Sequence, residues 1–116
     1  MKKNQAIHSD ERLKENIRYI DPKDIRTSNY IPLRMFNYKE DEDKRIYYGV
    51  IAQEVERLGL TNLLEIKGDG YLGVDYISLI MLKCASYERE LSNLRVECQQ
   101  LKDEIEKLKN DNNKKE

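Results

Sequence analysis

The chain has 116 residues, with 21 Lys and Arg against 22 Asp and Glu, so its many charges nearly cancel to a net −1. A balanced charge argues against a general nucleic-acid binder, because such proteins carry a basic excess on one face. Acidic residues are interspersed among the basic residues near the N-terminus, which also argues against nucleic-acid binding. These basic residues are Lys2, Lys3, Arg12, Lys14 and Arg18. No apolar run approaches the roughly 18 residues that a membrane span needs, and none follows Lys2 to form a signal peptide.

The sequence also gives little reason to expect a metal or cofactor. Cys84 and Cys98 are 14 residues apart, and His8 is the one histidine. Zinc sites in proteins use clusters of Cys and His at short spacings, which this chain lacks. We therefore expect no metal site and no cofactor.

Residues 17–74 are predicted to form a small α+β unit, because they hold all five glycines and both prolines. The segment 17–25 contains apolar residues and is interrupted by the turn signal Asp21-Pro22. Two stretches rich in aromatic and β-branched residues, 30–38 and 46–50, flank the charged loop 39–45 and predict a hairpin.

A short helix and a second hairpin complete this unit. Ile51, Val55 and Leu58 recur at helical spacing and Gly59 follows them, which predicts a helix over 51–58. Residues 63–67 and 71–74 flank Gly68-Asp69-Gly70, a turn that needs positive φ, and predict the second hairpin.

From residue 75 onward the pattern changes to a long heptad repeat. Apolar residues recur at alternating spacings of three and four: Ile77, Ile80, Cys84, Tyr87, Leu91, Leu94, Cys98, Leu101, Ile105 and Leu108. Placing Ile77 at heptad position a predicts a coiled-coil helix over 75–112, because the stripe is too narrow for a helix lying on its own domain. Asp75 is a candidate N-cap, and 113–116 are predicted to be a disordered tail.

The flanking charges predict the orientation of the coil. Acidic residues stand at g and basic residues at the following e positions: Glu90, Glu97 and Glu104 against Arg95, Lys102 and Lys109. A parallel coil brings each g beside the next e of its neighbour, whereas an antiparallel coil would bring acid against acid. The pattern favours a parallel homo-oligomer and does not decide between two and three chains. Cys84 and Cys98 are expected to be small apolar fillers, the alternative being a disulfide between chains.

The N-terminal segment allows two interpretations. Ser9-Asp10-Glu11 ahead of Leu13 and Ile17 is typical of a helix start with Ser9 as its cap. Ser9 and Lys14 are also the residue types of a nucleophile–base dyad, provided that the lysine loses its proton. Five residues separate them, which is about 140° on a helix and opposite faces on a strand. A working dyad therefore needs an irregular 9–14 segment or a contact from a neighbouring chain.

Three motifs resemble one known family in their order and spacing: the strings over 9–17 and 48–55, and Gly73-Val74-Asp75-Tyr76 leading into the long helix. This family is the C-terminal intramolecular chaperone domain of phage tailspikes, endosialidases and neck appendages. It is a self-cleaving peptidase family that also occurs in some eukaryotic membrane-anchored transcription factors. The resemblance covers roughly residues 8–108 of this chain.

The resemblance implies a homotrimer that helps an upstream β-helical or fibrous client chain to fold and then cuts itself off. It implies that Ser9 and Lys14 are the catalytic pair and that Ser9–Asp10 is the scissile bond. It assigns structural or inter-chain roles to further motif positions: Gly49, Gln53, Glu54, Asp75 and Tyr76. Assembly would take place in the cytoplasm of the bacterial host, followed by release from the mature fibre.

Several alternatives stay open at this point. Attack by Ser9 on its own carbonyl would form a strained four-membered ring, and attack on the preceding carbonyl would cut His8–Ser9 instead. Cleavage after Ser9 thus requires attack across chains, a strained backbone, or a water molecule activated by Ser9. A homotrimerisation module that does not cleave is the alternative function. Because eight residues precede Ser9, the chain is either an excised domain or acts on a separate client.

Overall fold

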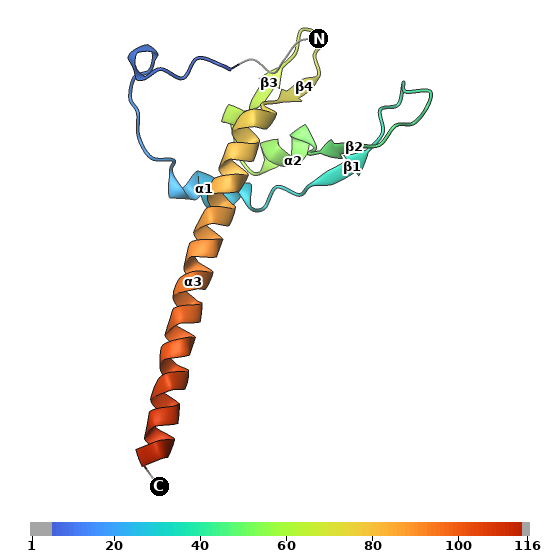
Figure 1. Cartoon of the computed structure of the whole chain (residues 1–116). Helices are drawn as coiled ribbons and strands as arrows, with labels where there is room; N and C mark the ends of the chain where they lie inside the picture. The colour runs from blue at the N-terminus through green and yellow to red at the C-terminus, as the bar shows by residue number, and fades with distance from the viewer. Residues whose placement is uncertain (1–5, 115–116) are drawn as a thin grey trace.

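The computed structural model describes residues 6–114, which form two β-hairpins, two short helices and one long C-terminal helix. The sequence predicts an N-terminal cleavage segment over 1–16 and a tail over 113–116. Residues 1–5 of this segment and residues 115–116 of the tail lie outside the described residues. Figure 1 shows α3 as a long stalk whose first turns carry the other elements. The bounds are η1 Glu11–Leu13, α1 Pro22–Ser28, β1 Arg34–Phe36, β2 Tyr47–Gly49, α2 Ala52–Arg57, η2 Thr61–Leu63, β3 Leu64–Ile66, β4 Leu72–Val74 and α3 Tyr76–Lys114. The α+β prediction is confirmed.

Both predicted hairpins are present, with strands shorter than expected. β1 and β2 are antiparallel and place Met35 opposite Tyr48 and Phe36 opposite Tyr47. β3 and β4 are antiparallel around the glycine-rich turn, where Gly70 has a φ of 86°. This left-handed conformation is one that glycine adopts without steric cost, as the sequence predicted.

The helix α2 differs by one residue at each end from the predicted 51–58, and Gly59 ends it with a φ of 84°. The interpretation of Asp21-Pro22 as an interrupting turn was wrong. Pro22 is the first residue of α1, and Asp21 caps it by accepting a hydrogen bond from the Lys23 amide at 2.9 Å. Proline suits this position because the first helical N–H has no partner within the helix.

The hydrophobic core is small and is completed by the first turns of α3. Its buried apolar residues come from α2, η2 and α3 and from the segments that connect the elements: Ile31, Val50, Val55, Leu60, Leu63 and Leu79. Leu79, Lys83 and Ser86 of α3 are buried and Leu82 packs against the core, a spacing that defines one stripe of the helix. The Lys83 ammonium donates a hydrogen bond to the Ile31 carbonyl at 2.7 Å. The stripe therefore joins α3 firmly to its own domain.

The ten residues predicted for the coiled-coil core lie on a different stripe of α3. Each of them is exposed in the single chain, including those beside the globular part. The long helix is thus confirmed, and it continues through Asn113 and Lys114, which were predicted to be disordered. We call this exposed stripe, from Ile77 to Leu108, the seam.

Gly49 is the contact point between β2 and the start of α3. A Cβ at this position would overlap the Tyr76 side chain, whose hydroxyl bonds the backbone of Val50. We expect Gly49→Ala to lower the free energy of unfolding by about 1–3 kcal/mol, because the clash must be relieved by moving Tyr76 or β2. Urea unfolding at one fixed protein concentration measures this effect. Gly68→Ala is the matched control, because a Cβ there meets nothing within 4 Å. Equal stability of the two variants would contradict the prediction.

Candidate active site

Residues 9–14 form a tight turn rather than the α-helix start that the sequence favoured. The 3-10 turn η1 is capped by Asp10, whose carboxylate accepts a hydrogen bond from the Arg12 amide at 2.9 Å. The prediction that Ser9 caps a helix was therefore wrong. Asp10 takes the capping place because its side chain reaches the amide two residues later, which short acidic side chains do readily.

Asp10 also pairs with the Arg12 guanidinium. The Arg12 Nε and Nη2 atoms donate to the two carboxylate oxygens at 3.1 and 2.8 Å. These side-chain bonds, helped by the bond from the Arg12 amide, hold the pKa of the Asp10 carboxyl below its usual range. The residue after Ser9 is thus fixed from two sides, by its own turn and by a two-pronged ion pair.

The turn brings Ser9 and Lys14 together within one chain. Leu13 and Lys14 donate their amides to the carbonyls of Asp10 and Glu11, which reverses the chain direction. The Lys14 ammonium then donates a hydrogen bond to the Ser9 Oγ atom at 2.6 Å. Regular structure would have kept the two side chains apart, and the irregular segment is what joins them.

This contact has the distance of a nucleophile–base pair, in which the two side chains must be within hydrogen-bond reach. An ammonium can donate a hydrogen bond but cannot accept a proton. General-base chemistry therefore requires that Lys14 first become a neutral amine. Desolvation favours the neutral form of a lysine.

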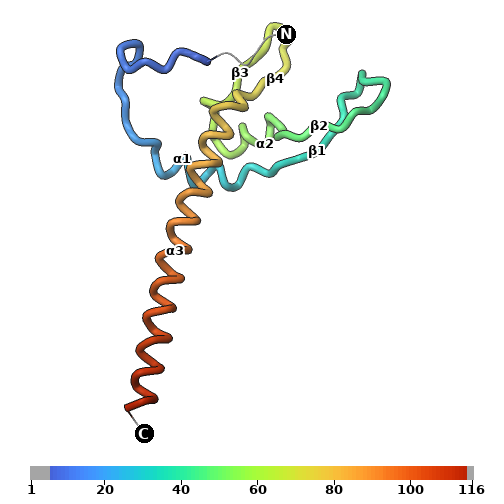
Figure 2. The backbone as a smooth tube through the Cα atoms, in the orientation of Figure 1, coloured from blue at the N-terminus to red at the C-terminus, as the bar shows by residue number. Residues whose placement is uncertain are grey.

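The surroundings of the pair do not supply this desolvation in a single chain. Residues 6–20 are exposed throughout, although they include large apolar side chains: Ile7, Leu13, Ile17, Tyr19 and Ile20. Figure 2 shows this segment as a loop that extends away from the hairpins before the chain enters α1. Its apolar side chains are free to be covered by another chain.

The other motif residues form a second group at the start of α3. Asp75 caps α3, since its carboxylate accepts hydrogen bonds from the Ser78 amide at 3.1 Å and the Ser78 hydroxyl at 2.7 Å. Glu54 of α2 pairs with Arg34 of β1 at 2.7 Å, and Gln53 is exposed. Gly49 lies against Tyr76. In Figure 1 the loop that carries Ser9 lies on the other side of α3 from β2 and α2. The structure therefore does not bring these residues to Ser9 within one chain.

Sequence reasoning missed three basic partners: Arg12 for Asp10, Arg34 for Glu54, and the buried Lys83. Arg12 had a usable signal, because a basic residue two positions after a capping acid can bond it. Lys83 also had one, because it is a charged residue that directly follows the largely apolar residues 77–82. The pairing of Arg34 with Glu54 depends on the fold.

Among residues 6–114, no cluster of three or more His, Cys, Asp or Glu gathers as a metal site. Within the same residues, no helix combines the length and apolar character that crossing a membrane requires.

Comparison with protein families places the first part of the chain in a known family. The model of a peptidase family described as chaperone of endosialidase matches residues 9–64. The matched range begins at Ser9 and includes Lys14, both strands of the first hairpin and α2. No curated protein matches the chain significantly.

The ion pair at the turn predicts a pH effect. We expect Arg12→Ala to raise the pKa of Asp10 toward its ordinary value, because the largest cause of the lowered pKa is the Arg12 side chain. A group whose pKa is lower when folded stabilises the turn above its unfolded pKa, and this contribution is lost as the pH falls through the folded pKa. Carboxyl NMR titration measures the shift. Arg18→Ala is the control, since Arg18 bonds the Asn16 carbonyl instead. An unchanged pKa in Arg12→Ala would contradict the assignment.

Proposed function

We propose that this chain, a member of the chaperone of endosialidase family through residues 9–64, aligns an upstream fibre chain as a parallel homotrimer and then releases itself by cutting the Ser9–Asp10 bond. The observation that carries the proposal is the 2.6 Å contact between the Lys14 ammonium and the Ser9 hydroxyl at the start of the matched residues. For a phage fibre, this assembly would take place in the cytoplasm of the bacterial host.

The seam supports assembly. It runs along a helix of 39 residues and remains exposed where the same helix is packed against its own domain. Removing such a stripe from water is favourable at about 25 cal/mol per Å² of apolar surface. The three g–e charge pairs favour a parallel arrangement, which places all N-terminal ends of α3 together.

A parallel trimer would solve the folding problem of a fibre. Fibre trimers must align three chains before their non-local contacts form, which costs entropy of loop closure. Holding the three chain ends together raises their effective concentration and sets a common register. Cutting the chaperone away afterwards makes unfolding kinetically difficult, because the device that set the register has gone.

The turn over residues 9–14 supports self-cleavage. In the proposed reaction the neutral amine of Lys14 accepts the proton of the attacking hydroxyl, and a new carbon–oxygen bond forms at the Ser9 carbonyl. The Ser9–Asp10 carbon–nitrogen bond then breaks, and the proton passes from Lys14 to the leaving amine of Asp10. In one route the attacking oxygen is the Ser9 hydroxyl of a neighbouring chain, which forms an ester that water later hydrolyses. In the other route the attacking oxygen belongs to a water molecule that Ser9 activates. Both routes need Lys14 as the proton acceptor.

The Arg12–Asp10 pair has a defined place in this reaction. It holds the residue on the leaving side of the scissile bond, so Asp10 is positioned before attack begins. Assembly would supply the remaining element, because a neighbouring chain that covers the apolar side chains of residues 6–20 would also take water away from Lys14.

Ser9→Ala tests the catalytic assignment. In a fusion with a reporter chain before residue 1, we expect wild type to release the reporter and Ser9→Ala to remain intact on denaturing gels. Lys14→Met should behave in the same way, because the base is lost. Ser92→Ala and Lys23→Met are matched controls, since both residues are exposed and lie outside the turn.

Persistence of the cut in Ser9→Ala would remove Ser9 from the chemistry. A protein that assembles but is never cut, in wild type as well as in the variants, would instead be a trimerisation module that does not cleave. The solvent exposure of the Ser9–Lys14 pair in the single chain is the observation that favours this second function.

A seam variant tests whether cutting depends on assembly. Leu94→Asp with Leu101→Asp places one charge per chain in each of two buried layers, which costs several kcal/mol. We expect a monomer by sedimentation, in which Ser9 and Lys14 still meet but cleavage is slowed at least about tenfold because Lys14 stays solvated. Val96→Asp is the control, because Val96 is 55% exposed against 53% for Leu94 but lies off the seam. A monomeric variant that cuts at the wild-type rate would show that assembly is not needed.

A further inference from the structure

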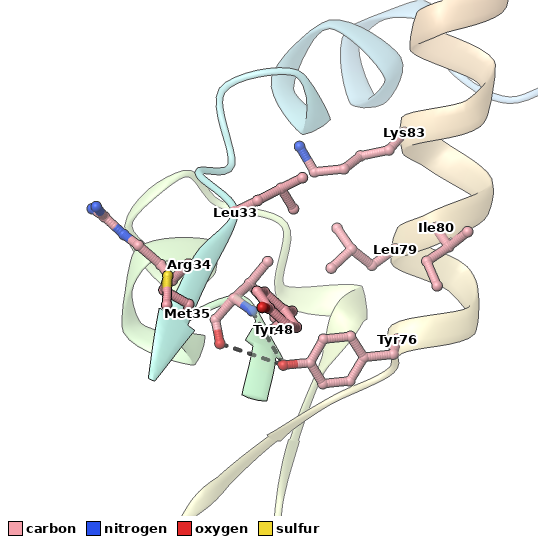
Figure 3. Close-up of a pocket in the computed structure, with 10 residues that line it drawn as sticks. Leu33, Arg34, Met35, Tyr48, Tyr76, Leu79, Ile80 and Lys83 are labelled. Carbon is pink, nitrogen blue, oxygen red and sulfur yellow. Dashed lines mark hydrogen bonds between the residues drawn. The ribbon is translucent and has the colours of Figure 1, made fainter. Parts of the chain in front are cut away.

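A groove lies beside the seam, between the first hairpin and the start of α3. It encloses about 430 Å³ and is lined by Leu33, Met35 and Tyr48 on the hairpin side and by Tyr76, Ile80 and Lys83 on the helix side. Figure 3 shows these side chains around one hollow, with Lys83 extending across one end and Tyr76 closing the other. Ile80 belongs both to the groove and to the seam, so the two surfaces are continuous.

The walls of the groove are mostly apolar, and the Tyr76 side is held in place. Met35 and Tyr48 are cross-strand partners on one face of the hairpin, and both are largely exposed in the single chain. The Tyr76 ring is held in place, because its hydroxyl accepts the Val50 amide at 3.2 Å and lies 3.4 Å from the Val50 carbonyl. An apolar hollow with fixed walls is typical of a surface that another side chain fills.

The heptad register identifies which side of α3 carries the groove. Extending the register from Ile77 at a places Tyr76 and Lys83 at g positions, and Met81 and Glu88 at e positions. The groove is thus on the g side of the helix. In a parallel coil, each g residue lies beside the e residue five positions later in the neighbouring chain. Tyr76 would therefore face Met81 of the neighbour, and Lys83 would face Glu88.

We propose that the groove receives the e side of α3 from a second copy of this chain, with Met81 inserted between the hairpin and Tyr76 and with Glu88 paired to Lys83. This inference rests on the proposed parallel assembly, and it extends the contact between copies from the coil to the first hairpin. Met81 suits a mostly apolar groove, because it is a flexible apolar side chain and is exposed in its own chain. On its own helix Met81 faces a different hollow, near Leu60 and Leu63.

The charge of Lys83 supports a partner that brings a carboxylate. Lys83 is buried, and its hydrogen-bond acceptor in the structure is the neutral carbonyl of Ile31. Burial lowers the pKa of Lys83 because the charged form loses solvation. A carboxylate would restore a favourable environment for the ammonium, since buried charges are stable when they are paired. Glu88 is exposed, and the ion pairs found among residues 6–114 do not include it.

The Lys83–Glu88 pair would also fix the register of the parallel coil, because its order of charges is opposite to that of the later g–e pairs. Lys83 with Glu88 is basic against acidic, whereas the three later g–e pairs are acidic against basic. A shift by one heptad would place Lys83 opposite Arg95, or Glu90 opposite Glu88. Like charges at these positions are unfavourable, so the pattern discriminates against shifted coils.

Photo-crosslinking of the full chain tests the occupant. In the test protein a benzophenone amino acid replaces Tyr48. In the control protein it replaces Tyr71, which lies beside β4 and is 76% exposed against 80% for Tyr48. After irradiation we expect position 48 to give a covalent dimer whose joined peptide contains Met81, and position 71 to give none. Sedimentation of each protein before irradiation establishes whether it is oligomeric.

The outcomes separate this inference from the proposed function. A monomeric wild type would overturn both. An oligomer in which position 48 joins no second copy, or joins a peptide other than the one around Met81, would overturn the groove and leave the coil intact.

Charge variants give an independent measurement. We expect Glu88→Lys to raise the dissociation constant of the oligomer at least about tenfold, because it faces Lys83 with a like charge. Glu106→Lys should leave the constant nearly unchanged, since this residue stands at heptad position b, away from the neighbour. Equal dissociation constants for the two variants would overturn the pairing of Glu88 with Lys83.

Discussion

The architecture depends on one helix with two stripes, of which one packs against its own domain and the other is exposed. Over its first turns, α3 buries Leu79 and Lys83 against its own domain while Ile77, Ile80 and Cys84 stay exposed on the adjacent stripe. The two stripes differ in length: the inner one follows the core from Leu79 to Ser86, and the outer one continues at heptad spacing to Leu108. A helix divided in this way cannot use its seam to stabilise the single chain, so the seam remains available to other chains.

The globular part is too small to be independent of this helix. Its core has six buried apolar residues, its strands have three residues each, and one of the six is Leu79 of α3 itself. Domains of this size bury a low fraction of their surface and are only marginally stable. The proposed assembly of α3 would therefore also stabilise the hairpins, and the groove over Tyr76 and Ile80 would add a direct contact between them.

The parts of the fold that could be predicted are those with a repeating or turn-defining pattern. The heptads predicted the long helix, and Gly59 and Gly70 marked turns where the structure has positive φ. The local cap at Asp21 was missed because Asp-Pro is compatible with both a turn and a helix start. The contact of Lys14 with Ser9 could not be derived either, since it depends on the turn that Asp10 stabilises rather than on any regular period. The buried role of Lys83 was missed because the heptad pattern of the seam is long and regular, whereas the buried stripe of the same helix is short and includes polar residues.

The bond between Tyr76 and the Val50 backbone has a mechanical consequence. It ties the first turn of α3 to β2, and Gly49 lets the ring lie directly on the strand. Rotation of α3 about its own axis would then move the first hairpin with it as a rigid body, because the Tyr76 ring holds α3 directly against β2. In the proposed trimer, winding three copies of α3 around one another would thus set the angle at which the three hairpins project. The supercoil would then determine the shape of the opening that the proposed upstream chain meets.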